Sequence, residues 1–219
     1  MDYKRITLIA GHYGSGKTNI AVNIAFDLKS LRNNVAIADL DIVNPYFRTK
    51  DSQKELEEAG IKLICSEYAN SNVDIPAIPQ DMYSIIDDKD ITAVVDIGGD
   101  DRGAYALGRY SDAILNEENY YMLFVINKYR PLTRNANDVI EVMHEIETAG
   151  KIKFTGIINN SNLGEETTAE DVLSSLSYAD EVSKATGLPV VMTCAKSDIC
   201  DELKNIFGLF PIRLQKKII

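Results

Sequence analysis

The residues with the clearest chemical meaning lie near the amino terminus of the chain, at positions 11–18. They read Gly-His-Tyr-Gly-Ser-Gly-Lys-Thr and directly follow the apolar run 6–10. Glycines let backbone N–H groups approach an anion closely, and a helix that begins at Lys17 adds the positive end of its dipole. The pattern G-x-x-x-x-G-K-T therefore predicts a loop that binds the phosphates of a nucleotide.

Each position of this loop has an expected task. Lys17 would reach the β- and γ-phosphates, and the Thr18 hydroxyl would take one position in the coordination shell of Mg²⁺. The alternative is a glycine-rich turn with an incidental lysine, which the order strand, loop, helix disfavours. The candidate nucleotide contacts are Gly11, Tyr13, Gly14, Ser15, Gly16, Lys17, Thr18 and Asn19.

Acidic residues follow two later apolar runs. The second run ends in Asp39-Leu40-Asp41 and the fourth in Asp96-Ile97-Gly98-Gly99. Ligands of open α/β sheets sit at the carboxyl ends of the strands, where a carboxylate can hold Mg²⁺ or orient an attacking water. The Gly99 amide is a candidate contact of the γ-phosphate. The alternative is that these aspartates only form turns or cap helices.

The elements that would position these residues alternate between strands and helices. The runs with strand character are apolar on consecutive positions, which is typical of parallel strands covered on both faces. We therefore predict an α/β fold with an open, mostly parallel sheet of about seven strands and helices on both faces. The predicted strands are 6–10, 35–39, 62–65, 92–97, 121–126, 154–159 and 189–193, and the predicted helices are 18–31, 51–58, 133–149, 169–186 and 198–207.

Composition sets the broad class. The 219 residues fit a single nucleotide-binding domain over 1–219, and 45% hydrophobic with 26% charged residues is usual for a soluble protein. The formal net charge of -10 disfavours nucleic acid as a partner, and no stretch has membrane-spanning length. Residues 1–5 leave no room for a signal peptide, so we expect a cytoplasmic protein.

The three cysteines, Cys65, Cys194 and Cys200, form neither an even framework nor a C-x-x-C pair. We expect them to be reduced. Cys194 and Cys200 leave open a metal site shared with a partner chain, but buried thiols are the favoured interpretation.

Four landmarks together resemble the MinD/ParA/CobQ group of P-loop ATPases, relatives of the nitrogenase iron protein and the arsenical pump ATPase. They are the loop 11–18, residues 39–41 in the first switch, residues 96–99 in the second switch, and Gly156-Ile157-Ile158-Asn159-Asn160. The resemblance covers nearly the whole chain. It implies ATP and Mg²⁺ as cofactors, with Asn159 or Asn160 on the adenine. It also matches Asp41 to the water-activating aspartate and Asp96 to the Mg²⁺-linked aspartate, and we place Asp39 with the metal ligands.

The chain departs from this group at one position. The group's loop begins G-K-G-G, and its early lysine reaches the nucleotide of a dimer partner, whereas this chain has His12 followed by Tyr13. Without this lysine, the resemblance gives weaker support for a homodimer that closes over ATP. Arg48, Lys50 and Arg102 are other candidates for a cationic group near the switches, unless they are ordinary surface charges.

The loop text also looks like that of metallochaperone GTPases, which read guanine with N-K-x-D. Here the corresponding residues are Asn127-Lys128-Tyr129-Arg130, so arginine replaces the acid that pairs with guanine. Only two histidines are present, and the histidine- and cysteine-rich tracts of that group are missing. ATP is therefore favoured over GTP.

Two other segments each allow two interpretations. Residues 41–48 are apolar and aromatic for a loop, so Tyr46 and Phe47 either face a partner or pack into the core. Residues 207–219 mix apolar and basic side chains, but Pro211 interrupts them. We expect this segment to pack against the domain rather than to bind a membrane as an amphipathic helix.

We therefore predict a Mg²⁺-dependent ATPase of the MinD/ParA-like class, a slow nucleotide-driven switch that acts on a protein partner. Lys17 and Asp41 would be catalytic, and Thr18, Asp39 and Asp96 would face the metal. One alternative is a small-molecule kinase or ATP-dependent ligase similar to dethiobiotin synthetase and cobyrinic acid synthase. Others are a module that binds ATP without turnover and a metallochaperone-type GTPase.

Overall fold

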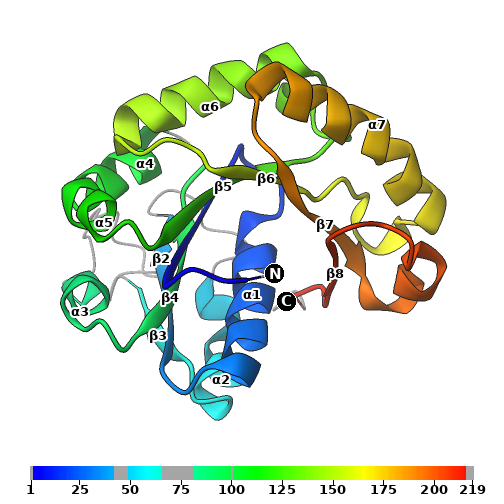
Figure 1. Ribbon diagram of the computed structural model, residues 1–219. Helices are drawn as coiled ribbons and strands as arrows, with labels where there is room; N and C mark the ends of the chain where they lie inside the picture. The colour runs from blue at the N-terminus through cyan, green and yellow to red at the C-terminus, as the bar shows by residue number, and fades with distance from the viewer. Residues whose placement is uncertain (1, 42–48, 66–80, 100, 216–219) are drawn as a thin grey trace, which may run out of the picture.

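An eight-stranded sheet runs through the centre of the computed structural model, which describes residues 2–41, 49–65, 81–99 and 101–215. The strand order is β3-β2-β4-β1-β5-β6-β7-β8, and every neighbouring pair is parallel (Figure 1). The strands are β1 (Ile6–Ala10), β2 (Val35–Leu40), β3 (Lys62–Ile64), β4 (Thr92–Ile97), β5 (Tyr120–Ile126), β6 (Gly156–Asn159), β7 (Val190–Lys196) and β8 (Leu209–Ile212).

Helices connect the strands and cover the sheet on both sides. Each crossover between parallel strands requires a long connection, which an α-helix or a 3-10 helix (η) provides here. The helices are α1 (Lys17–Leu31), η1 (Thr49–Ser52), α2 (Gln53–Glu58), α3 (Met82–Asp87), α4 (Asp101–Gly108), α5 (Ser111–Glu117), η2 (Pro131–Thr133), α6 (Ala136–Gly150), η3 (Gly164–Glu166), α7 (Ala169–Thr186) and η4 (Ser197–Leu203).

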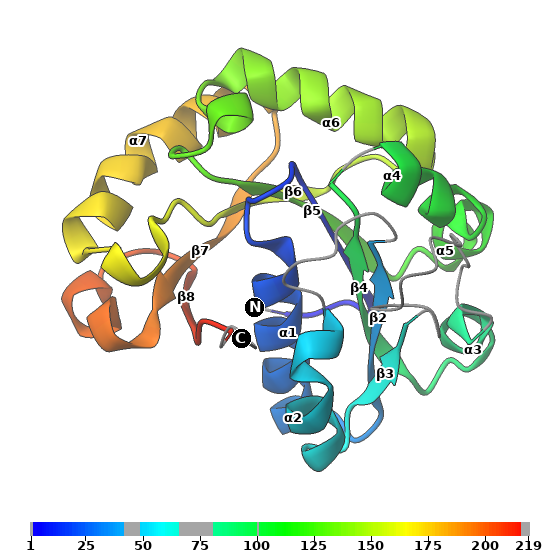
Figure 2. The ribbon, with the colours of Figure 1, turned by 180° about the vertical axis from the view of Figure 1, so that it is seen from behind.

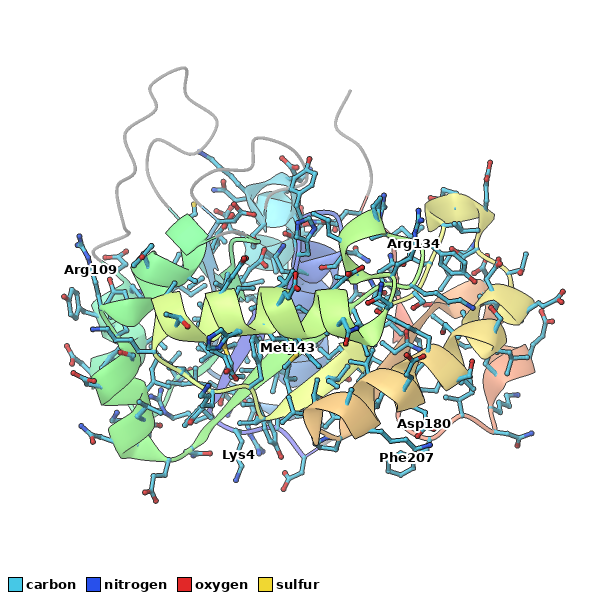
Figure 3. All side chains as sticks on the ribbon, turned by 90° about the horizontal axis from the view of Figure 1, so that it is seen from above. Lys4, Arg109, Arg134, Met143, Asp180 and Phe207 are labelled. Carbon is cyan, nitrogen blue, oxygen red and sulfur yellow. The ribbon has the colours of Figure 1, made fainter. Side chains whose placement is uncertain are left out.

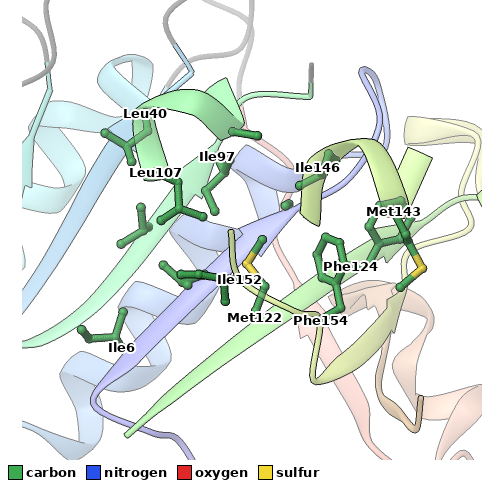
Figure 4. Close-up of a cluster of buried hydrophobic side chains, with 14 of the residues drawn as sticks. Ile6, Leu40, Ile97, Leu107, Met122, Phe124, Met143, Ile146, Ile152 and Phe154 are labelled. Carbon is green, nitrogen blue, oxygen red and sulfur yellow. The ribbon is translucent and has the colours of Figure 1, made fainter. Parts of the chain in front are cut away.

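Side chains of the central strands alternate between two hydrophobic clusters. Leu8 of β1 belongs to the cluster under α3 to α7, whereas Ile9 belongs to the cluster under α1 and α2. In the first cluster Phe124 and Phe154 meet edge to face with ring centroids 5.0 Å apart (Figure 4). Because both faces are covered, the central strands carry apolar residues at consecutive positions.

The two helical layers differ in size. Figure 2 places α1 and α2 on one face, with β8 beside α1. On the opposite face α6 and α7 lie side by side, and Met143 of α6 is in front when the molecule is seen from above (Figure 3). None of the helices in the described part of the chain is both long and apolar enough to cross a bilayer.

Helix ends follow local sequence signals. Thr168 caps α7 by accepting from the Asp171 N–H, and the Asp171 carboxylate accepts from the Thr168 N–H. Gly187 then ends α7 in the left-handed conformation with φ 73°. The prediction of a helix over 169–186 is therefore confirmed residue for residue.

The predicted α/β class with a parallel sheet is confirmed, and the differences concern short elements. The prediction of about seven strands omitted β8. Pro211 is tolerated in this strand because β8 lies at the edge of the sheet. The helix predicted over 198–207 is instead the 3-10 helix η4. Helices α3, α4 and α5 have six to eight residues each, too few for a clear helical period.

Cys194 is buried, and Cys65 and Cys200 are half-buried. That the thiols are reduced stays a prediction. Burial raises the pKa of the Cys194 thiol well above the ordinary value. A thiol of that kind stays protonated and unreactive.

Candidate functional site

The loop 11–18 connects β1 to α1 and depends on its glycines. A Cβ atom on Gly11 would lie 2.6 Å from the Val125 carbonyl oxygen of the neighbouring strand β5. Gly16 has φ +90°, and a Cβ there would lie 2.4 Å from Nδ2 of Asn160. These two positions accept only glycine without rearrangement, so the close packing of the loop follows from its sequence.

Lys17 begins α1 and is nearly enclosed, with 5% of its surface exposed. Its amine lies against the segment that follows β4. A Cβ built on Gly99 would be 3.0 Å from the Lys17 Nζ and 2.7 Å from the backbone nitrogen of Tyr13. The structure thus brings Gly99 into direct contact with the loop 11–18. The predicted contact of its amide with a γ-phosphate stays a prediction.

The three candidate aspartates meet at the carboxyl ends of adjacent strands. Asp39 of β2 and Asp96 of β4 are register partners, so their side chains lie on the same face of the sheet. Both are buried, and the backbone N–H of Asp41 donates to Oδ1 of Asp39 at 2.9 Å. Asp96 lies close enough to Lys17, Thr18 and Asp41 for each of them to shift the pKa of its carboxyl. That these carboxylates serve a nucleotide stays a prediction.

Burial and negative charge conflict at Asp96. Removal from water raises the pKa of its carboxyl to about 6, and the negative charge of Asp41 acts in the same direction. The charge of Lys17 and hydrogen bonds from Thr18 and Thr49 lower the pKa but do not cancel the effect of burial. The Thr49 Oγ1 donates to Asp96 Oδ2 at 3.4 Å.

Buried polar atoms without a partner among the described residues concentrate around this loop. They are Ser15 Oγ, Asp96 Oδ1 and Asn160 Oδ1, with Thr7 Oγ1 as the fourth atom. Buried polar groups are nearly always hydrogen-bonded, so such a group of orphaned atoms indicates a missing polar ligand or water. An orphaned carboxylate oxygen next to the Thr18 hydroxyl fits the oxygen ligands that Mg²⁺ requires.

Asn159 and Asn160 have different surroundings. Both polar atoms of the Asn159 amide are hydrogen-bonded within the fold. Nδ2 donates to Ser175 Oγ at 2.9 Å, and Oδ1 accepts from the N–H and hydroxyl of Ser161. The Asn160 Nδ2 donates to the Ser15 carbonyl oxygen at 2.7 Å, which leaves Oδ1 without a partner in the described part of the chain. Of the two candidates for the base contact, only Asn160 lines the cavity described next.

A cavity of about 750 Å³ opens beside the loop 11–18. Its size is in the range of cofactor sites. From the loop it runs past the residues after β5 and β6 to the residues of β8 and beyond. The lining residues are Tyr13, Gly14, Gly16, Lys17, Thr18, Asn19, Arg130, Asn160, Asn162, Gly164, Glu165, Ile212, Leu214 and Gln215.

Seven of these lining residues were not predicted from the sequence: Arg130, Asn162, Gly164, Glu165, Ile212, Leu214 and Gln215. None of them belongs to a motif that predicts a nucleotide contact. The last three lie in or just after the edge strand β8. A partial signal existed, because residues after β5 and β6 must reach the same edge of the sheet as the loop 11–18.

The side chains of the Asn127-Lys128-Tyr129-Arg130 segment have different contacts. Oδ1 of Asn127 accepts from the Tyr129 N–H at 3.0 Å, and the Lys128 amine donates to the Ser174 carbonyl at 3.0 Å. The Arg130 guanidinium lies above the loop, with its carbon 3.7 Å from where a Gly14 Cβ would stand. The cavity therefore receives a cation from this segment where the guanine-reading motif has an acid.

The remaining candidates are spread around the site. Half-buried His12 holds its ring Nδ1 3.1 Å from the Tyr13 carbonyl, while the Tyr13 side chain is exposed. Lys50 lies on η1. The loop with Tyr46 and Phe47, the candidate Arg48 and the side chain of Arg102 lie outside the described residues.

The expectation that the final segment packs on the domain is confirmed for residues 209–215, whereas the Phe207 side chain is 91% exposed. Asn23 of α1 exchanges two hydrogen bonds with the Arg213 backbone, at 2.9 and 3.0 Å. Ile212 belongs to the cluster under α1.

Comparisons with known proteins agree with this geometry. A family model described as CobQ/CobB/MinD/ParA nucleotide binding domain matches residues 6–187. A search among curated proteins found no match.

Several solved structures share the fold. The structure of FtsY from Mycoplasma mycoides superposes with a TM-score of 0.54 at 19% identity, covering 88% of this chain and 62% of that chain. The cell division protein FtsY from Thermotoga maritima gives a TM-score of 0.56 at 16% identity, with coverages of 87% and 61%. The 54 kDa signal recognition particle protein from Aeropyrum pernix, in complex with GDP, gives 0.52 at 17%, with coverages of 86% and 40%. The chain spans about three fifths or less of these proteins.

Proposed function

Because the chain belongs to the CobQ/CobB/MinD/ParA family of nucleotide-binding domains, we propose that it is a Mg²⁺-dependent ATPase that switches a partner protein. The observation that carries the proposal is the enclosed Lys17 amine, packed between the glycine-rich loop and Gly99. An ammonium group and backbone amides fixed in this way suit a triphosphate. The protein would work in the cytoplasm, and a second copy of this chain is one candidate partner.

The residues around Lys17 divide the tasks of hydrolysis. Lys17 would stabilise the charge that develops on the γ-phosphate oxygens, and Asp41 would hold the attacking water in line. Gly99, which touches the loop, would sense the γ-phosphate through its amide. A contact that exists only with the triphosphate is the basis of a nucleotide-driven switch.

The same residues fit Mg²⁺. Thr18, Asp96 and Asp39 would hold the ion, which would neutralise charge on the β- and γ-phosphate oxygens. Asp96 contributes an oxygen that has no partner in the described part of the structure. Thr18 already donates to this carboxylate, so the two ligands are held together before the ion arrives.

The cavity supports ATP rather than GTP as the nucleotide. Nδ2 of Asn160 is engaged by Ser15, so its free Oδ1 is an acceptor. An acceptor suits the 6-amino group of adenine and repels the 6-oxo group of guanine. Arg130 further replaces the acid that would pair with the N–H groups of guanine, although the fold is shared with a protein solved in complex with GDP.

Equilibrium titration with ATP and GTP tests this function. Wild-type protein should bind ATP more tightly than GTP. Lys17→Ala should reduce ATP binding by at least about a hundredfold, because a charge-assisted bond in an enclosed site is lost. Lys29→Ala is the matched control, since that amine bonds the Asn33 carbonyl at the other end of α1. Unchanged ATP affinity in Lys17→Ala would reject the assigned phosphate site.

A further inference from the structure

Three segments that are far apart in the sequence meet at one side of the cavity. They are the start of α1, the 3-10 helix η1, and residues 213–215, which follow β8. The Gln215 backbone N–H donates to Oδ1 of Asn19 at 3.0 Å, and Asn19 directly follows the candidate metal ligand Thr18. Residues 213–215 are thus fastened to the helix that carries the loop 11–18.

The Gln215 side chain makes a second connection. Its Nε2 donates to the Ser52 Oγ at 2.9 Å, and Ser52 is 5% exposed. Ser52 is the last residue of η1, and Thr49 is the first. Thr49 is fully buried and donates to the Asp96 carboxylate, so η1 is held at both ends by side-chain hydrogen bonds.

These contacts join two parts of the same site. Gln215 lines the cavity together with Ile212 and Leu214, on the wall contributed by β8 and the residues after it. Asp96 lies under the loop 11–18, beside Lys17. A continuous path therefore runs from the cavity wall through Gln215, Ser52 and Thr49 to Asp96.

We propose that Ser52 and Gln215 are positioning residues that couple nucleotide in the cavity to the placement of η1 on Asp96. This inference rests on the proposed function, because it needs a nucleotide in the cavity. A ligand that orders the wall favours the Gln215–Ser52 bond, and a fixed η1 keeps Thr49 on the Asp96 carboxylate. Linkage makes the effect reciprocal, so Mg²⁺ at Asp96 also tightens the wall around the nucleotide.

A double-mutant cycle tests the coupling. We would measure the affinity of a non-hydrolysable ATP analogue, with and without Mg²⁺, for wild type, Ser52→Ala, Gln215→Met and the double variant. Gln215→Met removes the amide but keeps the side-chain length and the backbone bond to Asn19. Each single substitution should weaken binding in Mg²⁺ by about threefold to tenfold, the effect of one lost hydrogen bond. The double variant should be no weaker than the weaker single variant.

A second readout separates positioning from a general loss of structure. The gain in analogue affinity on adding Mg²⁺ should shrink in all three variants, because Thr49 no longer has a fixed place on Asp96. Gln53→Ala is the matched control: this neighbouring amide bonds Glu57 on the exposed side of α2, and its loss should leave both affinities unchanged.

Two results overturn the inference. One is that the single effects add in the double variant, and the other is that the gain from Mg²⁺ persists in full. Both results can be observed only if the wild-type protein binds the analogue. If wild type does not bind the analogue at all, the proposed function itself fails, so the two failures are distinguished.

Discussion

Asp96 combines a buried carboxyl group with a site that needs negative charge. Its pKa of about 6, compared with an ordinary 3.8, means that the folded protein holds this proton more tightly than the unfolded chain. Between these two pH values stability therefore falls as pH rises, and the loss is complete above pH 6. The charged Asp96 carboxylate therefore lowers the free energy of unfolding, and a bound cation would offset this loss.

Asp96→Asn should therefore stabilise the nucleotide-free protein. Above pH 6 the gain should approach about 3 kcal/mol, the free energy equivalent of the pKa difference, and it should vanish below pH 4. Urea unfolding at pH 4 and pH 8 measures it, with exposed Asp112→Asn as the control. A variant less stable than wild type at pH 8 would contradict this account of Asp96.

Asp41 is predicted to act on the rate and not on the affinity. Asp41→Ala should bind ATP within about threefold of wild type and release phosphate at least about a hundredfold more slowly, the usual effect of losing a group that handles the reacting water. A phosphate-release assay beside a binding titration measures both. Retained turnover would assign the water to another residue.

At the residue scale, the sequence was sufficient to predict the residues whose type and spacing are constrained by close packing. Gly11, Gly16 and Lys17 belong to this class, because the loop closes only with glycines and an adjacent ammonium group. Asn162 and Gln215 could not be predicted. An amide fits many environments, and only tertiary packing brought these two to the cavity.

At the element scale, Arg5 connects the start of β1 to α5, to α3 and to the residues between α3 and β4. These contacts lie at the end of β1 that is opposite to the loop 11–18. Its guanidinium pairs with Glu117 at the end of α5 and donates to the carbonyls of Ile85 and Ile91, each at 2.9 Å. The hydrogen bond from Arg5 is the largest cause of the lowered pKa of Glu117. The tie fixes β1, which carries the loop at its other end.

Glu117→Ala should destabilise the domain by about 3 kcal/mol, because Arg5 stays buried without an acid. Since the pKa of Glu117 is lowered, its contribution is present above the ordinary 4.5 and is lost as pH falls through the folded value. The difference from wild type in urea unfolding should therefore be larger at pH 7 than at pH 3. Exposed Glu141→Ala is the control, and equal differences at both pH values would reject the ion pair.

The long elements could be predicted because their patterns are repeated many times. Helix α7 carries a capping box, a regular buried stripe and a final glycine. Strand β8 and helices α3 to α5 are short, and their places depend on docking against the rest of the sheet. The cavity wall made by β8 was missed for this reason.

At the scale of the whole molecule, the site joins segments from both ends of the described chain. Residues of β1, α1, η1, β4, β6 and β8 surround or support the loop 11–18 and the cavity. A ligand in the cavity therefore contacts segments that are far apart in the sequence, and it should stabilise the fold as one unit.

Thermal unfolding measures this stabilisation. With Mg²⁺ and an ATP analogue at a hundred times the dissociation constant, the gain is about 2.7 kcal/mol, or a midpoint roughly 5 to 10 °C higher. The transition should stay single, as expected for one domain over 1–219. Lys17→Ala should show no shift. Two transitions, with only one moved by the nucleotide, would contradict a single domain.

The most direct test of the central claim is a crystal structure of the protein with Mg²⁺ and a non-hydrolysable ATP analogue. We expect the triphosphate on the loop 11–18, with Lys17 on its terminal phosphates, Thr18 and Asp96 at the ion, and the adenine beside Asn160. An analogue bound elsewhere, while this cavity is open and empty, would contradict the account.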